Sequence, residues 1–178
     1  AVNLARIDSC NNTVNAVFDE DPRNVSLKEI LTLCTKISRD MRGVSKNVQY
    51  AYIDVQTGIN RELFCSTEGS RIDQSYALTH GMVAVVAQKP GGIPEVCYDY
   101  VGDLRGWEVV KGKNVYKQSF SDFAVLRTHE TLELTEAEFL PATTEPVVVV
   151  TNPHFNALLV HEIVGHPTEA DRVLKLET

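Results

Sequence analysis

The spacing of apolar residues changes near Gly43, and this change limits the fold more than any other feature of the sequence. Before it, a capping box of Ser26 and Glu29 opens a stretch with helical spacing. Its apolar positions are Leu27, Ile30, Leu31, Cys34, Ile37 and Met41. After it, apolar residues alternate with period two, which is typical of strands. The sequence therefore predicts an α+β fold, in which an antiparallel meander sheet is packed with helices.

The alternating region predicts three strand segments. Val48, Tyr50 and Tyr52 would share one strand face, and Thr57-Gly58 would turn the chain into a partner strand over residues 61–65. A second turn at 68–70 would lead into a long strand that ends near residue 86. Its same-face positions include Ile72, Tyr76, Leu78, Met82 and Val86. His80 shares that face, and an isolated imidazole of this kind favours a hydrogen-bonded structural role over a metal ligand.

The remaining segments follow from turn and capping signals. Residues 1–25 predict a strand or two followed by a solvated acidic loop, and residues 89–94 predict a loop. Apolar spacing over 121–140 predicts a helix closed by Pro141. Four valines at 147–150 predict a short strand buried on both faces. Asn152-Pro153 then supplies an N-cap and a first-turn proline for the last helix.

Composition limits the class of partner. The net charge is -7 and no run of five basic residues occurs, which argues against a nucleic acid or an anionic membrane as partner. No apolar run is long enough for a membrane span, and the N-terminus does not resemble a signal peptide. The four cysteines are widely spaced without a C-x-x-C pair. We therefore expect a reduced, cytoplasmic setting, with Cys34 acting in core packing.

Two other candidate ligand sites are weak. Gly106 and Gly112 are one residue too far apart for a phosphate-binding P-loop, and Asn114 stands where such a loop needs Ser or Thr. Trp107, Tyr98 and Tyr100 could stack on a ligand. Aromatic residues near a sheet edge are more often part of a core, so we expect these three to be buried.

The strongest chemical signal is the string His161-Glu162-Ile163-Val164-Gly165-His166. Zinc hydrolases hold the metal with about three protein ligands, leave a position open for water, and place a base beside that water. His161 and His166 are candidate metal ligands, and Glu162 is the candidate catalytic acid/base. The alternative is a structural pair of histidines with an incidental glutamate.

The five-residue spacing of the histidines creates a geometric requirement. At about 100° per residue, a regular helix would leave His161 and His166 roughly 140° apart. The helix must therefore widen by a π-type turn or break, most easily near Gly165 and Pro167. We predict a distorted helix end at Gly165.

Other polar residues near the string have weaker assignments. His154 lies about 10 Å along the helix axis from His161, which makes it a poor third ligand. Glu169 and Asp171 are candidates to orient the ligating histidines, and solvated charges at the helix exit are an equal alternative.

The string and the residues after it, through Glu169 and Asp171, resemble the TldD/PmbA family, also named modulators of DNA gyrase, on its TldD side. The turn Thr67-Glu68-Gly69 is similar to the Ser-Glu-Gly turn of that family, with Thr in place of Ser. The resemblance covers most of residues 26–178. It implies an N-terminal α+β domain over 1–145 and, over 146–178, the start of the catalytic region.

The resemblance also implies a function. Members are cytoplasmic zinc peptidases that act on small or unfolded peptides, often as dimers in which a PmbA-type partner lacks the motif. His161 and His166 would ligate zinc and Glu162 would be the acid/base. A cysteine from a later domain completes the family site, and none of the four cysteines here corresponds to it. We therefore expect a fragment, cut at both ends, that binds zinc weakly and is inactive by itself.

A second functional class remains open. The chain could be a non-catalytic scaffold subunit, in which exposed sheet edges bind an extended peptide or a partner subunit. Direct binding of nucleic acid, which the gyrase name suggests, conflicts with the acidic charge balance.

Overall fold

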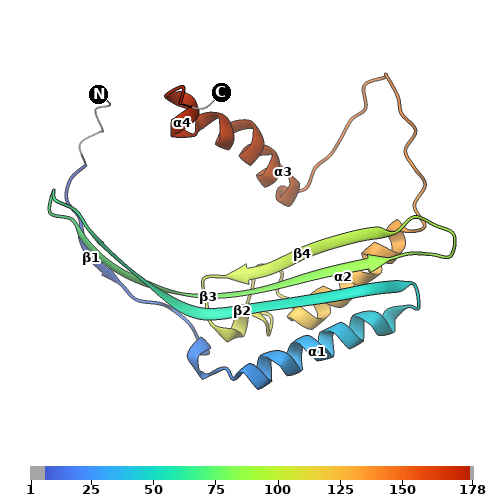
Figure 1. Ribbon diagram of the computed structural model, residues 1–178, viewed down its shortest axis with the longest axis horizontal. Coiled ribbons are helices and arrows are strands. Elements are labelled where there is room, and N and C mark those ends of the chain that lie inside the picture. Colours follow the sequence, from blue (N-terminus) through green and yellow to red (C-terminus); the bar gives the residue numbers. More distant parts are fainter. Residues whose placement is uncertain (1–6, 177–178) are drawn as a thin grey trace. The chain divides into compact units, whose positions relative to one another are not determined.

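The computed structural model describes residues 7–176, which belong to two compact units, Ala1–Glu138 and Phe139–Thr178. The first unit holds a sheet and two long helices, and the second holds the helix that carries the histidine string (Figure 1). The predicted α+β class is confirmed. The domain assignment, with its boundary at residue 145, stays a prediction for the whole protein.

The sheet of the first unit is built around its third strand. β3 (Arg71–Ala87) pairs antiparallel with β2 (Val48–Cys65) along its whole length. On its other side β3 pairs antiparallel with β4 (Glu95–Asp103) and parallel with the short β1 (Asn11–Val14). The sheet is therefore mixed, because the N-terminal strand joins the meander in a parallel sense. Residues 1–6 of the predicted N-terminal strand region lie outside the described residues.

The predicted turn at Thr57-Gly58 is wrong. Both residues lie in the middle of β2, where Thr57 pairs with Thr79 and Gly58 with Leu78. The hydroxyl oxygens of the two threonines are 2.7 Å apart, within hydrogen-bonding distance. The predicted second turn, at 68–70, is confirmed: the chain turns at Ser66–Ser70, where Gly69 takes a positive φ of 95° that favours glycine. An isolated glycine does not end a strand when a long partner strand supports both sides of it.

The face assignment at the start of β2 is also wrong. Val48 is buried in the core, whereas Tyr50 and Tyr52 are exposed on the opposite face. The pairing with β3 shifts between Val48 and Tyr50. Such a β-bulge adds one residue to one strand, so the side chains that follow change face relative to simple alternation.

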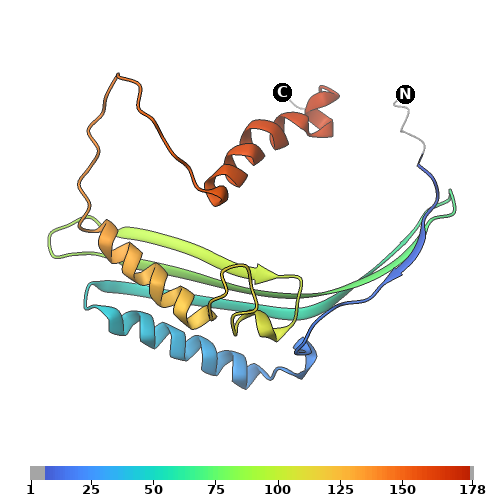
Figure 2. The same ribbon diagram turned by 180° about the vertical axis from the view of Figure 1, so that it is seen from behind.

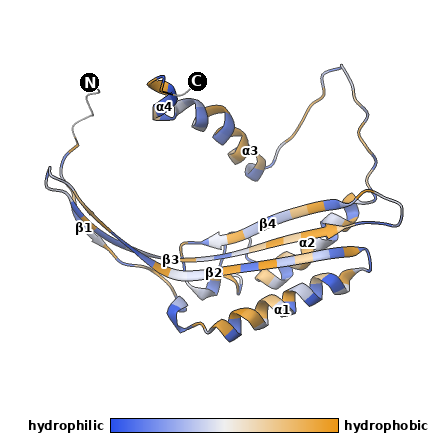
Figure 3. Cartoon of the chain, in the orientation of Figure 1, coloured by the Kyte–Doolittle hydropathy of each residue, from blue (hydrophilic) through white to orange (hydrophobic). Residues whose placement is uncertain are grey.

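Two helices cover one face of the sheet (Figures 1 and 2). α1 (Leu27–Val44) begins at Ser26, whose hydroxyl accepts a hydrogen bond from the Glu29 amide, so the predicted cap is confirmed. α2 (Phe120–Leu134) begins at Ser119 in the same way. Figure 3 shows hydrophobic residues along both helices and the paired strands. The core consists of Ile37, Met41, Val48, Val83, Val85, Val101, Trp107, Val110, Phe120, Phe123 and Ala124.

Helix α2 differs from its predicted extent and stripe. It ends at Leu134 and not at Pro141. Its buried face includes Thr128 and Thr131, whose hydroxyls donate to backbone carbonyls four residues earlier, while Leu126, which fits the apolar spacing of this segment, is exposed. Threonine can occupy a helix interface when its hydroxyl is satisfied within the helix, and apolar spacing alone does not reveal this.

The residues predicted to share one face of β3 do share it, but that face does not form the core. Ala77, Val83 and Val85, on the opposite face, are completely buried under the helices. Gly81 lies on that same buried face, where a Cβ atom would come within 2.8 Å of the Phe120 ring. Alternation separates the two faces of a strand, but only the position of the helices decides which one is covered.

The other face of the sheet is rich in tyrosine. Cross-strand pairing places Tyr52, Ala84 and Tyr98 in one row and Met82 beside Tyr100 in the next. Tyr98 is 73% exposed and Tyr100 47%, so the expectation that they are buried is wrong, whereas Trp107 is buried in the core as expected. His80 lies on this open face with its ring centroid 5.5 Å from that of Tyr100. Its assignment as a hydrogen-bonded structural histidine stays a prediction.

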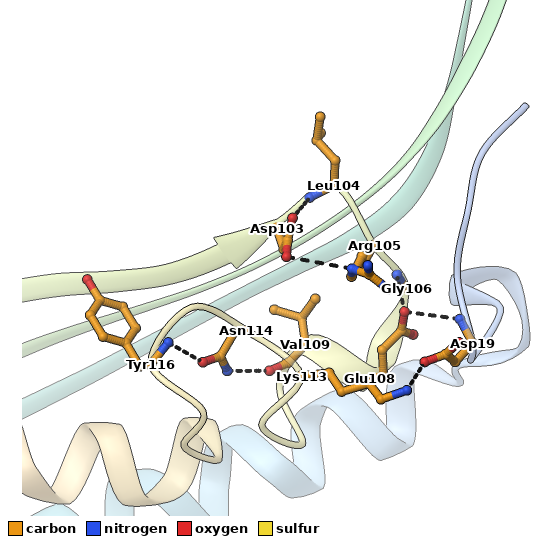
Figure 4. A network of polar contacts seen from close by, with 10 residues as sticks. All are labelled: Asp19, Asp103, Leu104, Arg105, Gly106, Glu108, Val109, Lys113, Asn114 and Tyr116. Carbon is orange, nitrogen blue, oxygen red and sulfur yellow. Dashed lines mark hydrogen bonds and ion pairs between the residues drawn. The ribbon is translucent and has the colours of Figure 1, made fainter. Parts of the chain in front are cut away.

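A buried carboxylate fixes the N-terminal loop (Figure 4). Glu108, in the 3-10 turn η2 (Trp107–Val109), is only 3% exposed and accepts hydrogen bonds from the amides of Asp19, Glu20 and Gly106. The chain then passes through the turn η1 (Pro22–Asn24) into α1. The acidic loop is solvated as predicted, and Asp19 forms an ion pair with Lys113 at its surface.

The described part of the second unit, residues 139–176, contains four short helical segments. They are α3 (Pro153–Val160), the π-helical turn η3 (His161–Gly165), the 3-10 turn η4 (His166–Thr168) and α4 (Ala170–Val173). The strand predicted at 147–150 is wrong, because these valines are exposed and have no assigned strand. β-branched residues favour extended backbone, but a strand buried on both faces needs neighbouring strands and layers. Among the described residues of this unit, none is buried.

Candidate metal centre

The helix that carries the histidine string begins as the sequence predicts. The side chain of Asn152 accepts a hydrogen bond of 2.8 Å from the Phe155 amide, and Pro153 occupies the first turn, where no intrahelical donor is needed. α3 then runs without interruption to Val160. The N-cap therefore fixes where the helix starts, and with it the position of His161 at its end.

The predicted distortion is confirmed. The amide of His166 donates to the carbonyl of His161, five residues earlier, and the chain from His161 to Gly165 is π-helical. Pro167 then lies inside a 3-10 turn, because it has no amide hydrogen to continue a regular helix. The wider turn compensates for the rotation that a regular helix would have left between the two histidines.

Thr168 stabilises this irregular end, a role that apolar spacing and capping signals do not predict. Its hydroxyl lies 2.8 Å from the carbonyl oxygen of Val164 and 3.0 Å from that of Gly165. Carbonyls at a helix end otherwise depend on water or on a following turn. A hydroxyl directly after the proline was the signal that could have identified this contact.

The π turn brings His161, Glu162 and His166 together. Their potential ligand atoms all lie within 4.8 Å of one another, and the two imidazole rings meet edge to face with centroids 4.6 Å apart. Glu162 Oε2 is 3.7 Å from His166 Nε2. All three side chains are at least partly accessible to solvent. Two imidazoles and a carboxylate at this separation fit a divalent metal of the zinc type.

Of the two carboxylates proposed to orient the histidines, only Glu169 is positioned to do so. Glu169 Oε1 lies 2.7 Å from His166 Nδ1. Asp171 instead accepts a hydrogen bond from the amide of Arg172, which is a local contact at the start of α4. The sequence does not show which of the two carboxylates reaches the imidazole, because that depends on the path of the backbone after Pro167.

Other candidate ligands do not join the group. His154, at the start of α3, is not among the clustered ligand atoms of the described residues. All four cysteines are free thiols in the first unit. Burial raises the pKa of the Cys34 thiol, which agrees with a packing role.

These features define an α+β unit and, in the second unit, a distorted helix that carries a His-Glu-His group suited to a divalent metal. The sequence is similar to that of a curated protein named Metalloprotease slr0863, from Synechocystis sp. (strain ATCC 27184 / PCC 6803 / Kazusa). The two are 27% identical over 169 residues, which is 94% of this chain and 34% of the relative. The chain thus spans about a third of the length of that relative. No family model matches the sequence.

The relative and the clustered group together support a metallopeptidase in general. Within residues 7–176, no helix has both the length and the apolar character needed to cross a membrane.

Proposed function

We propose that this chain supplies part of the active site of a zinc-dependent peptidase that hydrolyses peptide bonds in small or unfolded peptides. The observation that carries the proposal is the meeting of His161, Glu162 and His166 across the π turn, within 4.8 Å. The sequence similarity to a metalloprotease points in the same direction. The preference for small or unfolded peptides rests on the resemblance to the TldD/PmbA family.

His161 and His166 would hold the zinc ion through one imidazole nitrogen each. When bound, zinc polarises a scissile carbonyl and makes a water molecule more acidic. Glu162 follows His161 directly, and its Oε2 atom is 3.7 Å from Nε2 of His166, so Glu162 would be the base for that water. Its carboxylate accepts a proton from the attacking water and then delivers it to the leaving amine nitrogen.

The site in this chain is incomplete under this proposal. Two imidazoles and a catalytic base leave zinc one protein ligand short of the usual three. We therefore propose that a further ligand comes from outside these 178 residues, that the isolated chain binds zinc weakly, and that it does not hydrolyse peptides. A cysteine ligand, a cytoplasmic location and pairing with a PmbA-type subunit remain parts of the same proposal.

The decisive experiment compares zinc content and peptide cleavage in the whole protein. Glu162→Gln should keep zinc near one equivalent and reduce kcat by at least a hundredfold, because it removes the base and retains both ligands. His161→Ala should lose zinc and activity together. Glu145→Gln, an exposed substitution in the same unit, is the matched control. An active Glu162→Gln enzyme, or a wild-type protein that cleaves peptides without zinc, would contradict the mechanism.

A second function, that of a scaffold which binds a partner subunit, is favoured by the open face of the sheet. Tyr50, Tyr52, Tyr98 and Tyr100 are all exposed there, and a tyrosine side chain can bury roughly 150–250 Å². Four partly exposed tyrosines therefore offer several hundred Å², a substantial part of the ~800 Å² that one partner contributes to a standard interface. Tyrosine is also enriched at the energetic centres of interfaces.

The oligomeric state tests this second function. If a second subunit packs on the open face, the double substitution Tyr52→Ser and Tyr98→Ser should shift the protein toward a monomer in light scattering. The control is Ile93→Ser, which changes an exposed apolar residue in the 89–94 loop. A wild-type protein that is monomeric at 100 μM would argue against this scaffold role, while the zinc experiment would be unaffected.

A further inference from the structure

The backbone after His166 returns the carboxylate of Glu169 to the imidazole. His166–Thr168 forms a single 3-10 turn, and the amide of Glu169 donates to the carbonyl of His166 at 3.2 Å. The side chain of Glu169 therefore projects back along its own turn. Its Oε1 atom lies 2.7 Å from Nδ1 of His166, a short distance for a nitrogen–oxygen hydrogen bond.

This contact determines which nitrogen of His166 carries the proton. An ionised carboxylate can only accept hydrogen bonds, so the neutral imidazole must place its hydrogen on Nδ1. The lone pair is then on Nε2. Nε2 is also the atom that lies 3.7 Å from Glu162 Oε2, on the side of the clustered group.

We propose that Glu169 is a positioning residue, which fixes the tautomer and ring orientation of His166 so that Nε2 is the metal-binding atom. This inference rests on the proposed zinc site and adds a residue to it. Carboxylates that accept the second N–H of a ligating histidine commonly have this effect on metal sites.

The same geometry separates Glu169 from the role of third ligand. Nδ1 and Nε2 lie on different sides of the imidazole ring, so a carboxylate bonded to Nδ1 is directed away from a metal at Nε2. The other carboxylate oxygen, Oε2, is 3.6 Å from Nε of Arg172. Both oxygens of Glu169 are thus engaged away from the group formed by His161 and Glu162.

The first test reads the tautomer of His166 directly, in the whole protein after its metal has been removed. Long-range 1H–15N NMR at a fixed pH of about 8.5, where histidine is ordinarily neutral, distinguishes the two N–H forms. The wild type should show the Nδ1–H form. Glu169→Ala should show a mixture in which Nε2–H predominates, whereas Glu169→Gln should keep Nδ1–H because its amide oxygen still accepts. A wild-type spectrum dominated by Nε2–H would overturn the proposal.

The second test measures zinc affinity in the whole protein by competition with a chromogenic chelator. Glu169→Ala should weaken affinity by about 10-fold to 100-fold, the usual effect of removing a carboxylate behind a ligating histidine. Glu169→Gln should recover most of that loss. Asp171→Asn, which changes a carboxylate two residues away that does not contact the ring, should have no effect.

The outcomes distinguish this inference from the zinc-site proposal. If Glu169→Gln loses as much affinity as His166→Ala, then Glu169 is a ligand and the positioning role is wrong. If Glu169→Ala binds zinc as tightly as the wild type, the hydrogen bond has no role in metal binding and the inference is also wrong. If the wild type itself fails to bind zinc while His166 shows the Nδ1–H form, the zinc proposal fails and the tautomer assignment stands.

Discussion

Glu108 is the residue on which the N-terminal loop of the first unit depends. Burial acts to raise the pKa of its carboxyl group, but hydrogen bonds from the amides of Asp19, Glu20 and Gly106 act in the opposite direction. The net result is a pKa below the ordinary value of 4.5. The folded state therefore prefers the charged form, and the carboxylate stabilises the fold.

Replacing Glu108 by Gln should lower the free energy of unfolding at pH 7 by about 2 kcal/mol, because an amide nitrogen would face backbone donors. A carboxyl group with a lowered folded pKa contributes stability that is present above its unfolded pKa and is lost as pH falls through the folded value. The difference between wild type and Glu108→Gln should therefore narrow below pH 4.5. Urea unfolding at several pH values measures this, with exposed Glu136→Gln as control. A difference that is independent of pH would contradict the assigned cause.

Gly81 of β3 and Gly58 of β2 allow the effect of an added Cβ atom to be compared at a crowded and at an open position. A Cβ at Gly81 would meet the completely buried ring of Phe120 at 2.8 Å, whereas nothing lies within 4 Å of a Cβ at Gly58. Gly81→Ala should therefore lower the free energy of unfolding by about 1–3 kcal/mol through overpacking. Gly58→Ala should be neutral or slightly stabilising. Thermal unfolding of the two variants tests this, and equal stabilities would be the contrary result.

At the scale of elements, the π turn is what makes a five-residue spacing compatible with one metal. A π turn carries one residue more than the regular helix that it interrupts. Deleting Val164 should therefore restore a regular helix with the two histidines four residues apart and on one face. Both candidate ligands, His161 and His166, would remain close together in that variant, although the π turn would be lost.

We expect the Val164 deletion, in the whole protein, to retain zinc affinity within about tenfold. Inserting one alanine after Val164 instead would separate the histidines by six residues, which places them on different faces at about 100° per residue. The insertion should lower affinity by more than a hundredfold. Chelator competition measures both. Tight binding by the insertion variant would show that the spacing is not what positions the ligands.

Elements also show what apolar spacing does and does not predict. α1, the long β3 strand and the start of α3 were predicted because a cap or a turn residue marks each beginning. The sequence wrongly predicts a turn at Thr57-Gly58, in the middle of β2. The strand continues there because it is paired with β3, and this pairing joins residues that are distant in sequence. The sequence predicts that α2 extends to residue 140, whereas it ends at Leu134, because the apolar residues after Leu134 keep the helical spacing although the helix has ended.

At the scale of the whole molecule, the two units differ in their internal support. The first has a buried core between its helices and sheet, whereas no described residue of the second is buried. Short helices in water are marginal without tertiary packing. The helices of the second unit therefore receive little stabilisation from packing within their own unit.

This difference predicts hydrogen exchange in the isolated 178-residue chain. Amides of β3 near Val83 and Val85 should exchange only through global unfolding, because they are buried and paired on both sides. Amides of α3 should exchange at least a hundredfold faster. Mass spectrometry of exchanged peptides measures both units in one sample. Equal protection of α3 and β3 would show that the second unit is packed against another surface in solution.

The sequence by itself determined the α+β class, the caps of α1 and α3, and the need for a distorted helix between His161 and His166, because each follows from local backbone geometry. The tertiary structure decided which face of the sheet is buried and that Glu108 holds the N-terminal loop. It also decided that Glu169 rather than Asp171 reaches the imidazole. These outcomes depend on contacts between segments that are distant in sequence or on the exact path of a turn, and the spacing of residues along the chain does not determine either.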